Sequence, residues 1–78
     1  MYYVYFLELS NNTTYTGYTN NLKQRLQYHN SGSVISTKPH LPAKLKSYIA
    51  VETETIAINL ERYFKSGSGK AFAQKRLW

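Results

Sequence analysis

Two short runs rich in tyrosine and β-branched residues, separated by three turn-forming residues, dominate the start of this 78-residue chain. The first run, Tyr2–Leu9, is apolar on both faces apart from Glu8, which is typical of a central strand. The turn Ser10-Asn11-Asn12 is followed by Thr13–Thr19, a run with the composition of a returning strand. The chain is therefore predicted to open with an antiparallel β-hairpin.

The length of the turn decides which residues of this hairpin share a face. A three-residue turn pairs Tyr5 with Gly17. It also pairs Leu7 with Tyr15, so that Tyr5 and Tyr15 lie on the same face. A two-residue turn pairs Tyr5 with Tyr18 and sends Tyr15 to the opposite face, because one step of slip inverts every side chain. A site that uses both tyrosines needs the three-residue turn.

A helix, a loop and a third strand are predicted to follow. Asn20 or Asn21 can cap a helix that ends at about Asn30, because asparagine side chains accept bonds from the first helical N–H groups. Residues 31–42 contain two prolines and are expected to form a loop. Residues 43–52 alternate as a strand does, with one predicted face made of Leu45, Ser47, Ile49 and Val51.

The last third of the chain is predicted to be helical. Thr53 can cap a helix whose predicted apolar stripe consists of Ile56, Leu60, Tyr63 and Phe64. The segment Ser66-Gly67-Ser68-Gly69 is expected to break this helix, which leaves residues 70–78 as a short final helix. No linker interrupts the chain, so residues 1–78 are expected to form one α/β (α+β) domain.

Composition narrows the classes of function. There are no cysteines, which excludes disulfides, thiolate nucleophiles and zinc–thiolate sites. No apolar run approaches the roughly 20 residues of a membrane helix. The first residues also lack the basic and apolar regions of a signal peptide. A cytoplasmic protein without membrane association is therefore expected.

The balance of charge points to a polyanionic partner. The net charge is +6, and the chain contains four acidic residues, all glutamate; a basic but merely soluble domain is the alternative. A two-metal nuclease holds its ions about 3.5–4 Å apart with several carboxylates. With so few carboxylates, any metal ion is expected to depend on one glutamate, water and the phosphate of the substrate.

Several residues are candidates for chemistry, each with a structural alternative. Tyr5 and Tyr15 carry phenols, and the nearby Arg25 is expected to favour the phenolate form, although tyrosines in strands usually serve for packing. Gly17 within a strand indicates a bulge or a close approach of another group.

Arg25 and His29 are four residues apart on one helix edge, where they can bind phosphate and transfer a proton. The alternative is a solvated edge. Glu61 can hold a hard cation or form a surface ion pair with Lys65. The region from Ser66 to Lys70 lacks the length of a P-loop, but its N–H groups can contact a phosphate.

These features follow one another in the order found in GIY-YIG nuclease domains, and the chain resembles that family over nearly its whole length. The resemblance rests on Tyr3-Val4-Tyr5, Tyr15-Thr16-Gly17, the helix with Arg25 and His29, and Glu61. The likeness is greatest to small stand-alone members. The N-terminal nuclease domain of the repair enzyme UvrC is also similar.

The resemblance implies a three-stranded antiparallel sheet flanked by helices, and hydrolysis of phosphodiester bonds in DNA, including branched or damaged DNA, with one Mg²⁺ or Mn²⁺. Tyr5 or Tyr15 would activate or orient the attacking water. Arg25 would neutralise charge on the phosphate, and His29 would assist positioning or proton transfer. Glu61 would bind the metal ion.

Five further residues are expected to contact nucleic acid: Gly17, Lys38, Lys65, Ser68 and Lys70. Ser68 or Lys70 stands where many members of the family have a polar residue after the glutamate-bearing helix. Two other functions fit the sequence. The chain is either a nucleic-acid-binding module with weak or no cleavage, or a subunit that docks a protein through exposed tyrosines. A monomer and a homodimer are both open.

Overall fold

The computed structural model describes residues 1–78 and opens with the expected hairpin. Strand β1 (Tyr2–Glu8) pairs with β2 (Thr14–Thr19) in antiparallel orientation. The N–H of Leu9 donates to the carbonyl of Thr13 over 2.9 Å, and Asn12 takes the left-handed conformation with a φ of 65°. The turn therefore has three residues, and Tyr5 lies opposite Gly17, which is the register that a site using both Tyr5 and Tyr15 needs.

Strand β1 is the central strand of the sheet. Strand β3 (Lys44–Val51) pairs with its other side, which gives the antiparallel order β2-β1-β3. Val4 and Phe6 are completely buried on one face, and Tyr5 and Leu7 are buried on the other. Because both faces of β1 are covered, its side chains are apolar almost without alternation.

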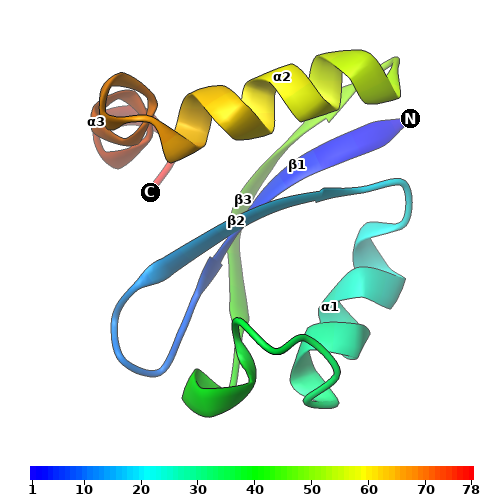
Figure 1. Ribbon diagram of the computed structural model, residues 1–78, viewed down its shortest axis with the longest axis vertical. Coiled ribbons are helices and arrows are strands. Elements are labelled where there is room, and N and C mark those ends of the chain that lie inside the picture. The colour runs from blue at the N-terminus through cyan, green and yellow to red at the C-terminus, as the bar shows by residue number, and fades with distance from the viewer.

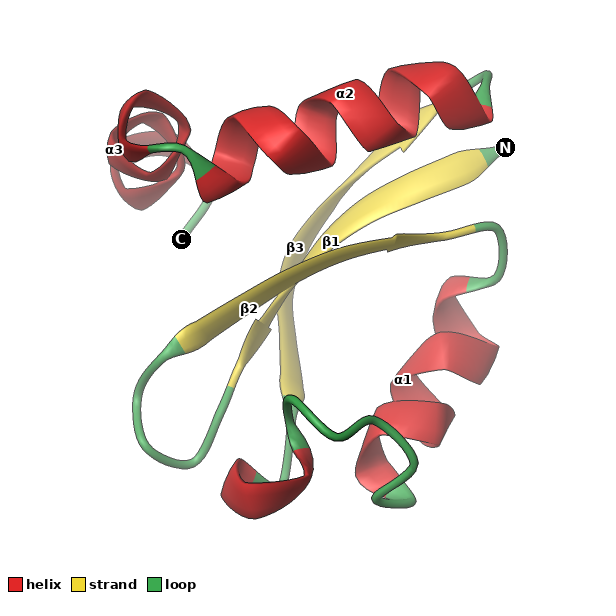
Figure 2. Ribbon diagram, in the orientation of Figure 1, coloured by secondary structure: helices red, strands yellow, loops and turns green.

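Helices cover the two faces of the sheet unequally (Figure 1). Helices α2 (Glu54–Lys65) and α3 (Gly67–Arg76) lie on one side, which is the upper side in Figure 2. Helix α1 (Leu22–Asn30) and a short 3-10 helix, η1 (Lys38–His40), lie on the other. This three-layer α+β arrangement confirms the predicted fold class. No helix has the length and apolar character needed to cross a membrane.

The ends of the first helix follow from the sequence. The side chain of Asn21, rather than that of Asn20, caps α1 by accepting a bond from the N–H of Gln24. Gly32, with a φ of 81°, terminates the helix in the left-handed conformation. The segment that follows is not entirely irregular, because Pro39 fits the first turn of η1.

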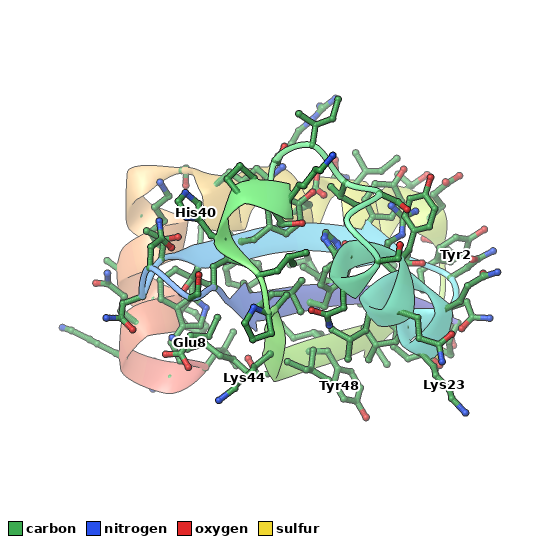
Figure 3. The ribbon with its side chains drawn as sticks, turned by 90° about the horizontal axis from the view of Figure 1, so that it is seen from below. Tyr2, Glu8, Lys23, His40, Lys44 and Tyr48 are labelled. Carbon is green, nitrogen blue, oxygen red and sulfur yellow. The ribbon has the colours of Figure 1, made fainter.

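A bulge in β3 overturns part of the predicted face pattern. Phe6 pairs with Ser47 and Leu7 pairs with Leu45, so the register shifts between them. The extra residue, Lys46, therefore lies on the face of Ser47, while Leu45 lies on the face of Leu7. Strict alternation had predicted Leu45 on the face of Ser47 and Lys46 on the other face. At the start of β3, Lys44 pairs with Glu8 (Figure 3).

The buried stripe of α2 also differs from the prediction. Ala57 and Phe64 are buried, and Leu60 packs against the core they form with β1. Ile56 and Tyr63, which were expected in the stripe, are 45% and 42% exposed. The small side chain of Ala57 lets α2 approach the sheet closely, and this displaces the stripe by about one residue from the most hydrophobic positions.

The glycine-rich segment does not separate α2 from α3 by a loop. Ser66 ends α2, and its hydroxyl accepts a bond from the N–H of Gly69, so that α3 begins at Gly67 rather than at residue 70. A Cβ on Gly69 would overlap the carbonyl of Tyr63 and lie 2.7 Å from the Cα of Phe64. Gly69 is therefore required where α3 crosses the end of α2.

We expect Gly69→Ala to destabilise the fold by about 1–3 kcal/mol, because the methyl group would push α3 away from α2. Gly67→Ala is the matched control, since no atom lies within 4 Å of a Cβ at that position. This control should be neutral or stabilising by up to about 1 kcal/mol through higher helix propensity. Urea unfolding of both variants measures the difference, and equal stabilities would contradict the proposed contact.

Candidate active site

The site begins with the contact between Tyr5 and Gly17 on neighbouring strands. A Cβ on Gly17 would lie 2.6 Å from Oη and 2.7 Å from Cζ of Tyr5. The phenol ring of Tyr5 therefore occupies the space that a side chain at position 17 would fill. Tyr15, on the same face, has its ring centroid 6.3 Å from that of Tyr5. The absence of a side chain at Gly17 brings the two motif tyrosines together.

A chain of buried hydrogen bonds fixes the hydroxyl of Tyr5. Its Oη lies 2.9 Å from Nε2 of His29 on α1, and Nδ1 of His29 lies 2.8 Å from Oγ1 of Thr37. The Thr37 hydroxyl in turn donates to the carbonyl of Val34 over 3.5 Å. Because the Thr37 hydroxyl uses its proton in this last bond, its oxygen accepts a hydrogen bond from Nδ1–H of His29. Nε2 then carries no proton and accepts a hydrogen bond from the hydroxyl of Tyr5. His29 and Thr37 are completely buried.

Burial controls the protonation of both partners. It raises the pKa of Tyr5 well above 10, and the negative charges of Tyr15 and Glu61 act in the same direction. Arg25 lowers this pKa, but by less, so the expected phenolate is not the resting form of Tyr5. Burial and then Arg25 lower the pKa of His29 from 6.5. Near neutral pH, a protonated phenol therefore faces a neutral imidazole.

Tyr5 also lines a pocket of about 370 Å³, here called the central pocket. It lies at the outer edge of β2, between α1 on one side of the sheet and α2 on the other (Figure 1). Its lining comprises Tyr2, Tyr5, Tyr15, Gly17, Tyr18, Thr19, Asn20, Arg25, Glu54 and Glu61. Side chains from β1, β2, the turn before α1, α1 and α2 thus converge on one space.

Two carboxylates enter the central pocket from α2. Glu61 is partly buried and forms an ion pair of 3.6 Å with Lys65, the surface pair that the sequence allowed. Glu54 accepts a hydrogen bond of 3.4 Å from the hydroxyl of Tyr18. Burial, followed by the charge of Glu54, raises the pKa of Tyr18. The pocket therefore offers carboxylate oxygens, which are a ligand type that Mg²⁺ and Mn²⁺ prefer.

No group of three or more acidic, histidine or cysteine side chains in the structure could hold a metal ion unaided. A cation bound by Glu61 would therefore complete its shell with water or with substrate oxygens. Mg²⁺ accepts this arrangement, because it usually keeps several waters and binds one or two carboxylates.

The structure brings most of the predicted catalytic residues together. Tyr5, Tyr15, Arg25 and Glu61 line the central pocket, together with Gly17, which was expected to contact nucleic acid. His29 lies behind the pocket and reaches it through Tyr5, so its position fits the role of a positioning or proton-accepting residue. The residues expected to contact nucleic acid that lie outside the central pocket are Lys38, Lys65, Ser68 and Lys70.

Six residues of the site were not among those predicted from the sequence: Tyr2, Tyr18, Thr19, Asn20, Thr37 and Glu54. Asn20 lines the pocket, and it is free to do so because Asn21 takes the capping role. Glu54 and Tyr18 become neighbours only when α2 packs on the sheet. Thr37 is eight residues from His29 in a loop without regular pattern, so no local signal identifies it as the partner of His29.

Comparison with known proteins now defines the family. Residues 1–76 match the family described as the GIY-YIG catalytic domain. The chain belongs to the GIY-YIG family. This confirms the resemblance that the two triplets, the helix and Glu61 indicated, and it identifies the chain as a catalytic domain of nuclease type, a class of hydrolases that act on nucleic acid.

Similar proteins include bacterial UPF0213 proteins. YsiG of Lactococcus lactis is 40% identical over 65 residues, which are 82% of this chain and 62% of that protein. SAG0778 of Streptococcus agalactiae is 40% identical over 70 residues, which are 88% of this chain and 80% of that protein. The chain thus spans less than two thirds of the length of YsiG. The solution NMR structure of UPF0213 protein BH0048 from Bacillus halodurans has a TM-score of 0.61 and 29% identity, covering 99% of this chain and 87% of that one.

The lowered pKa of His29 predicts that stability falls as the solution becomes more acidic. Below pH 6.5 the unfolded chain binds a proton at this position that the folded protein refuses, so the free energy of unfolding decreases with falling pH. Urea unfolding about one unit above and about one unit below pH 6.5 measures this loss.

His29→Gln should flatten this pH dependence even though it weakens the fold at both values. His40→Gln is the matched control and should keep the dependence of the parent protein. The assignment to His29 is wrong if the two variants show the same slope.

Proposed function

We propose that this chain is a metal-dependent endonuclease that hydrolyses phosphodiester bonds in DNA, with branched or damaged DNA as its substrate in repair or recombination. The observation that carries the proposal is the convergence of Tyr5, Arg25 and Glu61 on the central pocket from three different elements. Hydrolysis of a phosphodiester uses a general acid–base, a positive group that binds phosphate and a carboxylate that binds metal. Tyr5, Arg25 and Glu61 would supply these in turn.

The charge of the central pocket supports a role for a metal ion. Glu54 and Glu61 outnumber Arg25 among its charged residues, and His29 behind it is neutral, so the pocket alone carries one net negative charge. A phosphate would be repelled from this space unless a cation were present. A divalent cation held by Glu61 would supply the positive charge that reverses this sign and the Lewis acidity that hydrolysis of a phosphodiester uses.

The residues of this chain that would hold such an ion are Glu61 first and Glu54 second. Glu61 projects into the pocket from the middle of α2, and its only ion-pair partner is the more exposed Lys65. Glu54 is already bonded to Tyr18. Its carboxylate is thereby oriented to accept hydrogen bonds from water around the ion, the outer role that such groups often have.

Tyr5 and His29 are proposed to form a proton relay. As the hydroxyl oxygen of Tyr5 takes a proton from the attacking water, its own proton passes over 2.9 Å to Nε2 of His29. The tyrosine therefore need not ionise beforehand, which removes the difficulty of its raised pKa. By accepting a hydrogen bond from Nδ1–H, Thr37 favours the tautomer in which Nε2 is unprotonated. Arg25 neutralises the charge that develops on the phosphate.

The remaining two functions are less well supported by the arrangement of side chains. A module that only binds nucleic acid has no need for two carboxylates in a pocket beside a buried tyrosine–histidine pair. Docking of a protein through tyrosines requires them to form one exposed patch. The three most exposed, Tyr28, Tyr48 and Tyr63, instead stand on α1, β3 and α2.

The proposal predicts that Glu61→Gln abolishes cleavage of supercoiled plasmid and of a branched oligonucleotide in Mg²⁺ or Mn²⁺. Loss of a Lewis acid worth several kcal/mol corresponds to a rate reduction of about 10³-fold or more. Glu54→Gln should reduce cleavage by about 10–100-fold, as expected for an outer partner of a metal site.

Glu52→Gln removes the same charge from an exposed residue outside every pocket and should leave cleavage unchanged. EDTA should stop the parent enzyme. Full activity of Glu61→Gln, or full activity in EDTA, would refute the metal assignment. An inactive parent that still binds DNA would favour the binding module instead.

The relay predicts different consequences for the two motif tyrosines. Tyr5→Phe removes the group that links water to His29 and should reduce the rate of cleavage by about 10²–10⁴-fold. Tyr15→Phe keeps the ring that packs at 5.0 Å from the ring of His29 and removes a hydroxyl outside the relay, so the loss should be smaller. Single-turnover rates compare the two, and a larger loss in Tyr15→Phe would assign the base to Tyr15.

A further inference from the structure

A second pocket, here called the hairpin pocket, lies at the other end of β2. It has a volume of about 400 Å³. Its lining comprises Asn12, Thr13, Thr14, Lys46, Lys70, Gln74 and Trp78. These residues come from the hairpin turn, the bulge of β3, α3 and the residue after it. The hairpin pocket shares no lining residue with the central pocket, and no carboxylate side chain lines it.

Lys46 is held in position without being neutralised. The bulge turns it toward the hairpin pocket, where its Nζ lies 3.4 Å from Oγ1 of Thr14 and 5.4 Å from the ring centroid of Trp78. The single ion pair of the protein joins Lys65 to Glu61, so neither Lys46 nor Lys70 is paired with a carboxylate side chain. Fixing a long side chain before binding lowers the entropy that a ligand must otherwise overcome.

The chemistry of the hairpin pocket fits a phosphodiester backbone. Two ammonium groups supply point charges for phosphate oxygens. The hydroxyl group of Thr14, which accepts a hydrogen bond from Lys46 and keeps its own proton, and the amide group of Gln74 add uncharged hydrogen-bond donors of the kind that contact phosphate and sugar. Lys46 lies over the Trp78 ring, and this ring also makes a T-shaped contact with the ring of Phe6. The pocket therefore offers contacts to the backbone rather than a platform for stacking bases.

The path between the two pockets matches the spacing of nucleotides. Thr14 lines the hairpin pocket and Gly17 lines the central pocket, and both belong to the edge strand β2 (Figure 1). Three residues of strand span about 10 Å. In B-form geometry one strand advances about 3.4 Å per nucleotide, so this distance corresponds to about three nucleotides.

We propose that the hairpin pocket is a second phosphodiester-binding site, which holds the substrate strand about three nucleotides from the bond that is cut. This assignment rests on the nuclease function proposed above. The proposed site adds Lys46, which the bulge of β3 places in the hairpin pocket, to the residues expected to contact nucleic acid. It also places Lys70 in a pocket separate from the catalytic groups. The site would contribute to binding of the substrate and take no part in the chemical step.

Trp78 provides a direct test, because it is the only tryptophan of the chain. The parent protein and Glu61→Gln are titrated in EDTA with single-stranded DNA of about 16 nucleotides. Binding in the hairpin pocket should change the emission of Trp78 in both proteins with the same midpoint as the anisotropy of a labelled strand. An anisotropy change without any change in Trp78 emission would overturn the proposal.

Substitution of both lysines should weaken binding in a salt-dependent way. Each phosphate contact on a single strand contributes about 0.7 to the slope of log K against log salt concentration, so Lys46→Ala/Lys70→Ala should lower this slope by about 1.4. Lys23→Ala is the charge-matched control, because Lys23 extends from α1 into solvent and lines none of the pockets (Figure 3). An unchanged slope in the double variant would overturn the proposal.

Cleavage in Mg²⁺ separates this inference from the proposed function. If the double variant cleaves and binds as the parent does, the hairpin pocket is not a binding site, although the nuclease function stands. If the binding results hold but the parent does not cleave, the second site stands and the catalytic role fails. A parent protein that binds no DNA refutes both.

Discussion

The pairing of Tyr5 with Gly17 is the contact on which the rest of the site depends. A residue with a side chain at position 17 would occupy the volume of the phenol, whose atoms lie 2.6–2.7 Å from the position of a Cβ. With the ring seated there, its hydroxyl reaches His29 and ties the central strand to α1. The bond from His29 to Thr37 then ties α1 to the loop before β3. One missing side chain in an edge strand thus sets the relative positions of three separate segments.

The sequence predicted those features that follow from local chemistry. Spacing by four on a helix placed Arg25 beside His29, and the length of the turn limited the hairpin to two registers, of which the structure has the one that pairs Tyr5 with Gly17. The bulge at Lys46 was missed because an extra residue changes nothing in the composition of a strand. Glu54 and Thr37 were missed for a different reason. Glu54 meets Tyr18 only when α2 packs on the sheet, and Thr37, although eight residues from His29, lies in a segment without a regular pattern, so no periodicity of the chain indicates either contact.

Small side chains decide how closely the layers approach. This explains why the predictions for the last third of the chain were partly wrong. A pattern of hydrophobicity selects Ile56 for the buried stripe, yet the sheet lies against Ala57. Likewise, Gly69 indicates a break by its low helix propensity, yet it is the one residue that lets α3 cross the end of α2. In a domain with 15 buried residues, close packing of the layers contributes to the stability of the fold, as does the size of the apolar groups.

The distribution of charge separates attraction of the substrate from catalysis. The protein carries a net charge of +6, yet the central pocket, with Glu54, Glu61 and Arg25, is negative by one charge. The Debye length is about 8 Å at physiological ionic strength, so each pocket acts on a phosphate mainly through its own groups. In the proposed scheme Lys46 and Lys70 would therefore attract the backbone with or without metal, whereas the central pocket would accept the scissile phosphate only with a cation held by Glu61. Binding and cleavage would then depend on different side chains at the two ends of one strand, and the metal ion would couple them.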